Sequence, residues 1–302
     1  MLYLVEKYGK ILVSIMNVGD IMRADGKRLK HVDPMYTIVP HIMDKRYDAM
    51  NMITIDIPYE PVQNYLNAKR KEGTPMSHMA VIIAAYLRTC AKYPALNRFI
   101  MNKKVYARNH YAVSMVVLTP GTDGEETMSK MYFEPTDTIF DVNNKINEFV
   151  EKNRNAPKEN NMEKFMSALL SVPGLLTVGI GLIKILDKWG LLPRWIIDLS
   201  PFHNSLVISN LISIRTNHIY HHVYEFGTTG VLITMGNFRE VAKRKVGGEI
   251  VFEKTMPLGV VMDERICSGY YFSKAFRELQ KYVKDPSLLE VPPEEVVKDP
   301  AL

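Results

Sequence analysis

The stretch PLGVVMDERICSGYYFSKAFRELQKYV, residues 257–283, joins a strand, a polar turn and a helix in one short segment. Its first six residues are almost entirely apolar, a composition typical of a strand buried in a sheet. The charged triplet Asp263-Glu264-Arg265 follows directly. A helix is predicted near 270–284, because apolar residues recur there every three or four positions. The segment therefore places charged side chains where a core strand ends.

Strand patterns recur on the N-terminal side of this segment. The predicted strands are ITIDI at 53–57, YAVSMVVL at 111–118, residues 127–133, LVIS at 206–209 and VLITM at 231–235, with a hairpin across Gly247-Gly248 before the quoted segment. One helix is predicted to start at Thr74-Pro75 and to carry an apolar stripe as far as Cys90, and a second covers 138–153. Strands and helices mix without regular alternation, which indicates an α/β domain with a mixed sheet.

Composition limits the classes of function. The chain has 302 residues, 47% of them hydrophobic and 24% charged, as in a globular protein with an adequate core. Its net charge of +5 comes from interspersed residues, so we expect no nucleic-acid partner. Two cysteines in so long a chain favour a reducing, cytoplasmic location. We predict a single domain over 1–289 and an extended tail over 290–302.

An apolar insert at about 157–200 interrupts the α/β pattern. Residues 165–183 include no formal charge and are long enough to cross a bilayer. Pro173 and the glycines at 174, 179 and 181 make one continuous helix unfavourable. A crossing would also separate the two halves of one domain. We therefore expect short helices, serving as a buried hairpin, a lid over an apolar pocket, or a peripheral membrane contact through 165–199.

Five short motifs resemble one enzyme family. They are Ile38-Val39-Pro40-His41, YPALN at 93–97, LVISNL at 206–211, VLITMG at 231–236 and the quoted segment at 257–283. In this order they resemble the catalytic domains of the 2-oxoacid dehydrogenase (dihydrolipoyl) acyltransferases and of chloramphenicol acetyltransferases. The resemblance implies a chloramphenicol acetyltransferase-like mixed β-sheet sandwiched with helices, with 38–41 in an early strand. It also implies a homotrimer with active sites between subunits, in which an acyl group passes from coenzyme A or a related thioester to a small-molecule acceptor.

The sequence departs from the family at the positions that matter most. Where the family has its catalytic histidine this chain has Glu264, and Ser268 replaces the family aspartate, whereas Ser209 matches the oxyanion-binding serine. An unperturbed glutamate has a pKa of about 4.3 and is a weaker base than histidine at about 6.5. Burial can raise it, and pairing with Arg265 would lower it again. Glu264 is thus either the base or a structural ion-pair partner.

Other residues offer alternatives to Glu264. The loop NHIYHHVYEFG supplies His221 and His222 as substitute bases, since it falls near the family's subunit interface. Neutral histidines are favoured over a metal site built from His203, His218, His221 and His222, so no metal is expected. Cys267 is expected to be a packing residue. Three hypotheses remain: an acyltransferase with a non-standard base, a non-catalytic trimeric binding or scaffold protein (a pseudoenzyme), and a peripheral membrane protein.

Overall fold

The computed structural model describes residues 23–118, 126–154, 167, 171 and 174–302. Within these ranges the strands are β1 Gly26–Arg28, β2 Met50–Pro58, β3 Arg98–Met101, β4 Lys104–Arg108, β5 Tyr111–Leu118, β6 Glu126–Phe133, β7 Leu206–Asn210, β8 Val231–Met235, β9 Arg239–Arg244 and β10 Ile250–Asp263. The α-helices are α2 Pro34–Ile42, α3 Tyr59–Lys71, α4 His78–Lys92, α5 Ile139–Arg154, α7 Leu175–Lys188, α8 Arg194–Leu199 and α9 Gly269–Lys284. Short 3-10 helices span Arg46–Ala49, Pro94–Asn97, Leu211–Ile214 and Pro286–Leu289.

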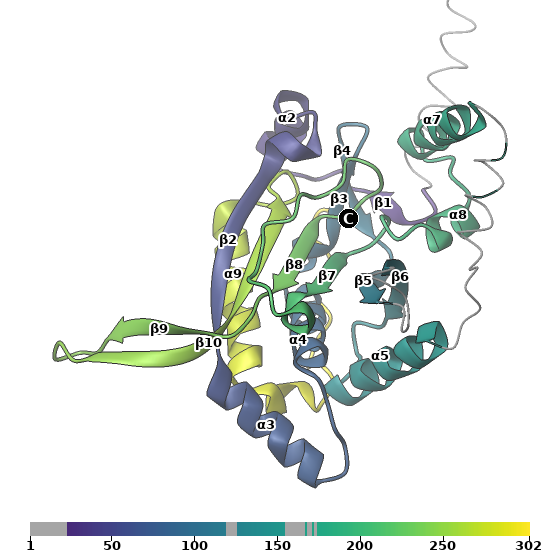
Figure 1. The fold of residues 1–302 in the computed structure, drawn as a ribbon. Helices are drawn as coiled ribbons and strands as arrows, with labels where there is room; N and C mark the ends of the chain where they lie inside the picture. Colours follow the sequence, from purple (N-terminus) through teal and green to yellow (C-terminus); the bar gives the residue numbers. More distant parts are fainter. Residues whose placement is uncertain (1–22, 119–125, 155–166, 168–170, 172–173) are drawn as a thin grey trace, which may run out of the picture.

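A mixed seven-stranded sheet forms the centre of the protein (Figure 1). Its order is β2-β10-β8-β7-β5-β6, and β9 pairs with the first half of β10 to form an arm that leaves the body. β7 runs parallel to both β5 and β8, whereas the other pairs are antiparallel. The mixed α/β sheet predicted from the sequence is therefore confirmed. A second sheet of order β1-β4-β3 lies beside it.

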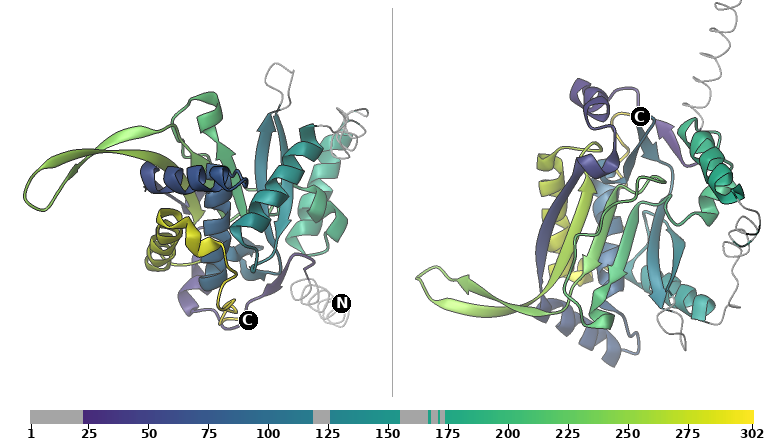
Figure 2. Two further views of the ribbon diagram at one scale, coloured as in Figure 1. Left: turned by 90° about the horizontal axis from the view of Figure 1, so that it is seen from below. Right: turned by 45° about the horizontal axis from the view of Figure 1, so that its top comes forward.

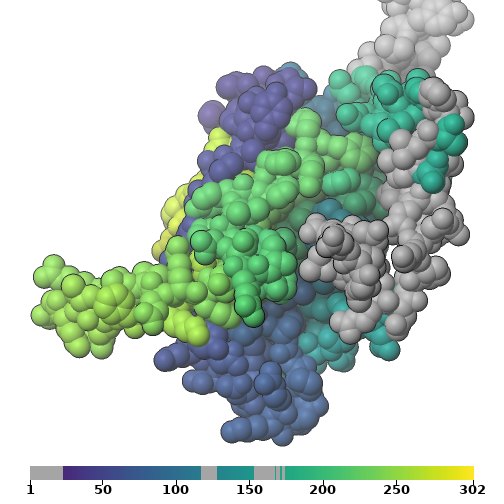
Figure 3. All heavy atoms as spheres, in the orientation of Figure 1, coloured from purple at the N-terminus to yellow at the C-terminus, as the bar shows by residue number. Residues whose placement is uncertain are grey.

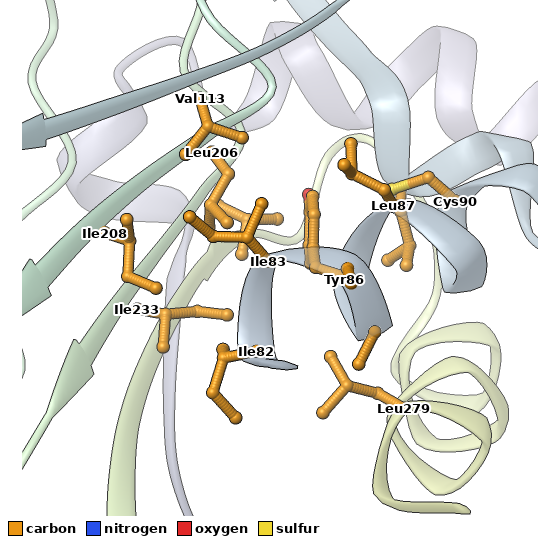
Figure 4. Close-up of a cluster of buried hydrophobic side chains, with 14 of the residues drawn as sticks. Ile82, Ile83, Tyr86, Leu87, Cys90, Val113, Leu206, Ile208, Ile233 and Leu279 are labelled. Carbon is orange, nitrogen blue, oxygen red and sulfur yellow. The ribbon is translucent and has the colours of Figure 1, made fainter. Parts of the chain in front are cut away.

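The main core lies between this sheet and the helices α4 and α9, which contact each other on one face (Figure 2). Every residue of α4 from 80 to 91 is buried. The sequence predicted one buried apolar stripe, whereas α4 is buried on all sides. Figure 4 shows the contact: Ile83 and Tyr86 of α4 pack near Val113 and Leu206 of the strands. Removing these side chains from water is the main stabilising contribution.

The start of α4 corrects a prediction. The helix begins at His78, and Ser77 caps it by accepting a 3.1 Å hydrogen bond from the Ala80 N–H. Thr74, the predicted cap, belongs to the preceding turn. Its N–H and its hydroxyl both donate to the carbonyl of Lys69, at 2.9 and 3.2 Å. Thr74 therefore binds a carbonyl at the C-terminal end of α3. This local hydrogen bond competes with the role of Thr74 as the N-cap of α4.

The placement of residues 38–41 in a strand, expected from the resemblance, is also wrong. These residues lie in α2. Asp33 caps that helix by accepting from the Met35 N–H at 2.9 Å, and Pro34 occupies its first turn. Both are favourable helix-start signals. The capping residue Asp33 and the following Pro34 therefore favour a helix over a strand at residues 38–41.

The C-terminal tail packs along the domain without forming a helix or strand after residue 289. Its main attachment is the ion pair of Asp299 with Arg98, at 2.6 and 2.7 Å. The Val297 N–H also donates to the carbonyl of Ala91 at 2.8 Å. Ala301 is buried. The tail therefore contributes to the fold.

The insert forms α7 and α8 at the margin of the molecule. The expectation of short helices is confirmed for 175–199, while 165–173 fall mostly outside the described residues. No helix in the described part of the chain is long and apolar enough to cross a membrane. Asp187 of α7 is buried against Arg23, whose Nη2 donates to it at 2.7 Å. A polar contact thus attaches the insert to the domain.

Candidate functional site

The motif at the end of β10 is held by a buried group of three charges. Asp263 accepts hydrogen bonds from Arg265 Nε at 2.8 Å and Nη2 at 2.7 Å, and Arg46 Nε lies 3.4 Å from it. All three residues are at most 3% exposed. Arg46 Nη1 also donates to the Gly227 carbonyl at 3.2 Å. A bidentate arginine–carboxylate pair has fixed geometry, so this group sets the direction of the chain after β10.

Glu264 points away from that group. Its carboxylate accepts a 2.5 Å hydrogen bond from Asn51 Nδ2, and its N–H donates to the Ala49 carbonyl at 2.9 Å. The suggested pairing of Glu264 with Arg265 is therefore wrong. Glu264 and Arg265 lie in the turn that follows β10, and within this turn the partner of Arg265 is Asp263, two residues away. Glu264 is half-buried.

The two neighbouring positions have structural roles. Ser268 caps α9 by accepting from the Tyr271 N–H at 3.2 Å, a task that serine and aspartate perform about equally well. Cys267 is 3% exposed, and burial raises the pKa of its thiol well above the usual value. A protonated thiol is a poor nucleophile. The packing role expected for Cys267 fits this environment.

Ser209 lies in a row of residues that crosses four strands. It pairs with Thr234, Thr234 with Gly259, and Gly259 with Thr54. These residues share the sheet face opposite α4, because Val207, Leu232 and Val261, each two positions away, cluster on that face. The Ser209 hydroxyl is half-buried and makes no hydrogen bond within the described part of the chain. It is available as a donor.

Ser209 and Glu264 lie far apart within one chain. β10 continues four residues past Gly259 and ends at Asp263, the residue before Glu264. At the rise of a β-strand this places the end of β10 about 13 Å from the row of Ser209. Two groups that act on one reacting atom must each come within roughly 3 Å of it. One chain therefore does not bring the two residues to a common site.

The segment 216–224 crosses the sheet over this row. The Thr234 hydroxyl donates to the Ile219 carbonyl at 2.6 Å and accepts from its N–H at 3.2 Å. Glycine permits the approach: a Cβ on Gly259 would lie 2.5 Å from the Ile219 oxygen, and one on Gly236 would lie 2.2 Å from the His218 nitrogen. Both glycines are therefore required by close backbone contact.

The contact of segment 216–224 with the sheet places His218 beside the row of Ser209. His218 was not among the candidate bases predicted from the sequence. A 3.0 Å hydrogen bond joins its Nε2 to the Thr54 hydroxyl, and its buried Nδ1 has no partner in the described residues. Burial lowers its pKa below the usual value, Arg239 lowers it further, and Asp56 opposes this. The ring is neutral at pH 7 and can accept a proton. In the sequence, Gly236 and Gly259 are the residues that could have indicated this close contact.

The other histidines do not form one cluster. His221 and His222 stack on each other with ring centroids 4.6 Å apart, and His221 Nδ1 lies 2.9 Å from the His222 carbonyl. His203 is buried elsewhere, between Ser200 and Asp187, at 2.8 and 3.1 Å. No group of metal-ligating side chains is found in the described ranges. The tentative four-histidine metal site is therefore not assembled.

Two pockets border the motif, and a third lies apart from it. One of about 420 Å³ runs between β2 and α9 and is lined by Asn51, the partner of Glu264. A second, of about 380 Å³, is lined by Arg46 and Arg265 on the other side of the motif. A third, of about 450 Å³, lies between α2 and β4. Its lining includes Arg28, Lys30, Lys103 and Lys104 and contains no carboxylate side chain. This last pocket has the charge to bind phosphate groups.

Comparison with known proteins now identifies the architecture. No family model and no curated protein sequence matches the chain. A probable dihydrolipoamide acetyltransferase from Listeria monocytogenes 4b F2365 superposes with a TM-score of 0.55 at 13% identity, over 84% of this chain and 92% of that one. The cubic core of the pyruvate dehydrogenase multienzyme complex gives 0.56 at 11% identity, over 84% and 88%. A chloramphenicol acetyltransferase gives 0.51 at 10% identity, over 85% and 99%.

The chain has a chloramphenicol acetyltransferase-like fold. The expectation drawn from five short motifs is confirmed at this level. At 10–13% identity the similarity establishes the fold alone. The roles of the side chains must therefore be argued from their own environments.

Proposed function

We propose that this protein transfers an acyl group from coenzyme A, or a related thioester, to a small-molecule acceptor at a site shared by two subunits of a homotrimer. The observation that carries the proposal is the unengaged hydroxyl of Ser209, half-buried in a fold common to acyltransferases. A hydroxyl so placed can donate to the oxyanion that forms when a thioester is attacked.

The chemistry needs one base and one oxyanion donor. The base removes the proton from the acceptor's thiol, hydroxyl or amine as that atom attacks the thioester carbonyl. The tetrahedral oxyanion forms opposite Ser209, the carbon–sulfur bond then breaks, and the leaving thiolate takes the proton back. Glu264 occupies the base position in this proposal, at the place where the resemblance puts a histidine. His218 is the second candidate, because its lowered pKa keeps the ring neutral.

The separation of the two residues supports a shared site. Within one chain the row of Ser209 lies about 13 Å along β10 from Asp263, the residue before Glu264. A neighbouring subunit can supply the missing partner if the interface brings its Glu264 opposite Ser209. The basic pocket beside α2, lined by Lys103 and Lys104, is the proposed place for the phosphates of the acyl carrier.

Complementation tests this arrangement. We expect Ser209→Ala to lower acetyl transfer from acetyl-coenzyme A by about 100- to 1,000-fold. Glu264→Gln should abolish it, because the amide keeps the shape and loses the basicity. Co-expressing the two inactive variants should restore roughly one quarter of the activity if each site takes one residue from each subunit. Cys90→Ala, at a core position, is the control for general loss of folding.

Three results would count against the proposal. A stable monomer by light scattering would remove the shared site. Wild-type activity in Ser209→Ala would remove the oxyanion donor. Activity that survives Glu264→Gln but falls in His218→Asn would move the base to His218.

A non-catalytic trimer that binds a ligand or acts as a scaffold is the alternative. The hydrogen bond from Asn51 to Glu264 and the capping role of Ser268 favour it, because both give the altered positions structural tasks. If no acyl thioester is turned over and Glu264→Gln lowers stability, this alternative replaces the enzyme.

A further inference from the structure

Helix α7 has the reverse of the usual burial pattern. A helix at the edge of a globular domain normally buries its apolar stripe and exposes its charges. Here Val178 is 69% exposed, Leu182 55% and Ile185 56%, while Asp187 is 2% exposed. Asp187 is the buried residue of the helix. At 100° per residue, the three apolar side chains lie on the side roughly opposite Asp187. The apolar stripe therefore faces away from the domain.

Buried polar contacts fix this orientation. Arg23 Nη2 donates to the Asp187 carboxylate at 2.7 Å, and Arg23 Nη1 donates to the Asp187 carbonyl at 2.6 Å. His203 Nε2 lies 3.1 Å from the same carboxylate. Turning α7 to bury its stripe would break the contacts of Asp187 with Arg23 and His203. Breaking a buried ion pair is costly, so this inward rotation of the helix is unfavourable.

The apolar surface continues past the end of α7. Leu191 is 52% exposed and Trp195, in α8, is 61% exposed. The chain has two tryptophans, Trp189 and Trp195, and both lie in this stretch. Tryptophan is enriched where a protein meets the boundary between lipid and water, because its ring is apolar and its N–H is polar. Figure 3 shows α7 at the margin of the molecule.

The charges beside the stripe are mainly positive. Lys184, Lys188 and Arg194 are exposed. The one exposed carboxylate of residues 174–199 is Asp198, which pairs with Arg194 at 2.7 Å. The other, Asp187, is buried and paired. The exposed surface is thus apolar with a basic flank, which matches the negative surface of a bilayer that contains anionic lipids.

We propose that the outward surface of α7 and α8, from Leu175 to Trp195, binds the surface of an anionic lipid bilayer without crossing it. The proposal goes beyond acyl transfer and does not depend on it. The apolar stripe inserts at the boundary of head groups and acyl chains, while the lysines pair with lipid phosphates. Charge complementarity and the position of both tryptophans favour lipid over another protein chain.

Vesicle binding tests this directly with the full chain. The probes are vesicles of phosphatidylcholine alone and vesicles of phosphatidylcholine with phosphatidylglycerol. We expect flotation with the anionic vesicles and a shift of tryptophan emission to shorter wavelength, since Trp195 is exposed in this surface and Trp189 lies at the end of α7. Binding should weaken as salt is added. Leu182→Glu should lower partitioning into the vesicles by about tenfold or more, because it places a charge where an apolar side chain would enter the bilayer.

The matched control is Val246→Glu, at the tip of the β9–β10 arm. Its side chain is fully exposed, and the substitution adds the same charge far from α7. Partitioning should stay at the wild-type level. An equal loss in Val246→Glu would assign binding to the arm and overturn the proposal. So would the absence of vesicle binding, or binding unaffected by Leu182→Glu. If Leu182→Glu instead dissociates an oligomer without changing flotation, the stripe is a subunit interface and the proposal fails.

Discussion

The contact between the segment 216–224 and the sheet gives the sharpest prediction, through Gly259→Ala. A Cβ at this position would lie 2.5 Å from the Ile219 carbonyl oxygen and 2.7 Å from the Thr234 hydroxyl. Both distances are shorter than real Cβ contacts, and one neighbour is backbone that cannot turn aside. Overpacking of this kind costs about 1–3 kcal/mol. Loss of the Thr234–Ile219 hydrogen bonds adds about 0.5–1.5 kcal/mol. We therefore expect the free energy of unfolding to fall by about 2–4 kcal/mol.

Urea unfolding followed by circular dichroism measures this loss. The control is Gly269→Ala, ten residues further along the same motif, where a Cβ would meet nothing within 4 Å. It is the first residue of α9, so the change should be neutral or stabilising by up to about 1 kcal/mol. If Gly259→Ala unfolds at the same urea concentration as Gly269→Ala and the wild type, the segment does not press on the sheet and the assignment of His218 to the row of Ser209 is wrong.

Three further predictions concern buried charges and thiols. Asp187→Asn should loosen the insert and lower stability by about 2–4 kcal/mol; limited proteolysis should cut within 174–199 first, and an unchanged cleavage pattern would refute the anchor. Burial alone would raise the pKa of Asp25, but Arg23 lowers it from 3.8 to about 2. The folded protein then binds fewer protons than the unfolded one in this range, so stability should fall as pH drops from about 4 to about 2. Asp25→Asn should reduce that dependence in urea titrations at several pH values, and the remainder comes from other carboxyl groups with lowered pKa values, such as Asp187. Burial raises the thiol pKa of Cys90, to about 12, and of Cys267, so a disulfide exchange reagent should label neither in the native protein and both in urea. Rapid native labelling of Cys267 would reopen a covalent role for it.

Local pattern was sufficient for most of the regular structure. The runs at 111–118 and 231–235 are strands with the predicted bounds, because a continuous apolar run between turn residues suits a strand covered on both faces. The start of α4 and the helix at 38–41 were missed for one physical reason. Competing local hydrogen bonds, at Thr74 and at Asp33, decide where a helix begins, and a pattern of apolar residues does not contain them.

At the candidate site, the features that depend on the tertiary structure are easier to separate from those that the sequence predicts. The sequence left the partner of Glu264 open, because the pairing of Asp263 with Arg265 and of Glu264 with Asn51 depends on the turn that follows β10. The position of His218 beside Thr54 was beyond the sequence, because it depends on 164 residues of intervening chain and on the space left by two glycines. The distance between Ser209 and Glu264 likewise follows from strand register, which brings distant segments together.

The amino-acid sequence was sufficient to predict the fold class and most of the strands and helices. These features are local: period, turn chemistry and the order of short motifs suffice for them. The tertiary structure alone decided that α7 turns its apolar stripe outward. Its hydrophobic sequence would favour burial, but the pairing of Asp187 with Arg23, 164 residues away, holds the helix in the opposite orientation.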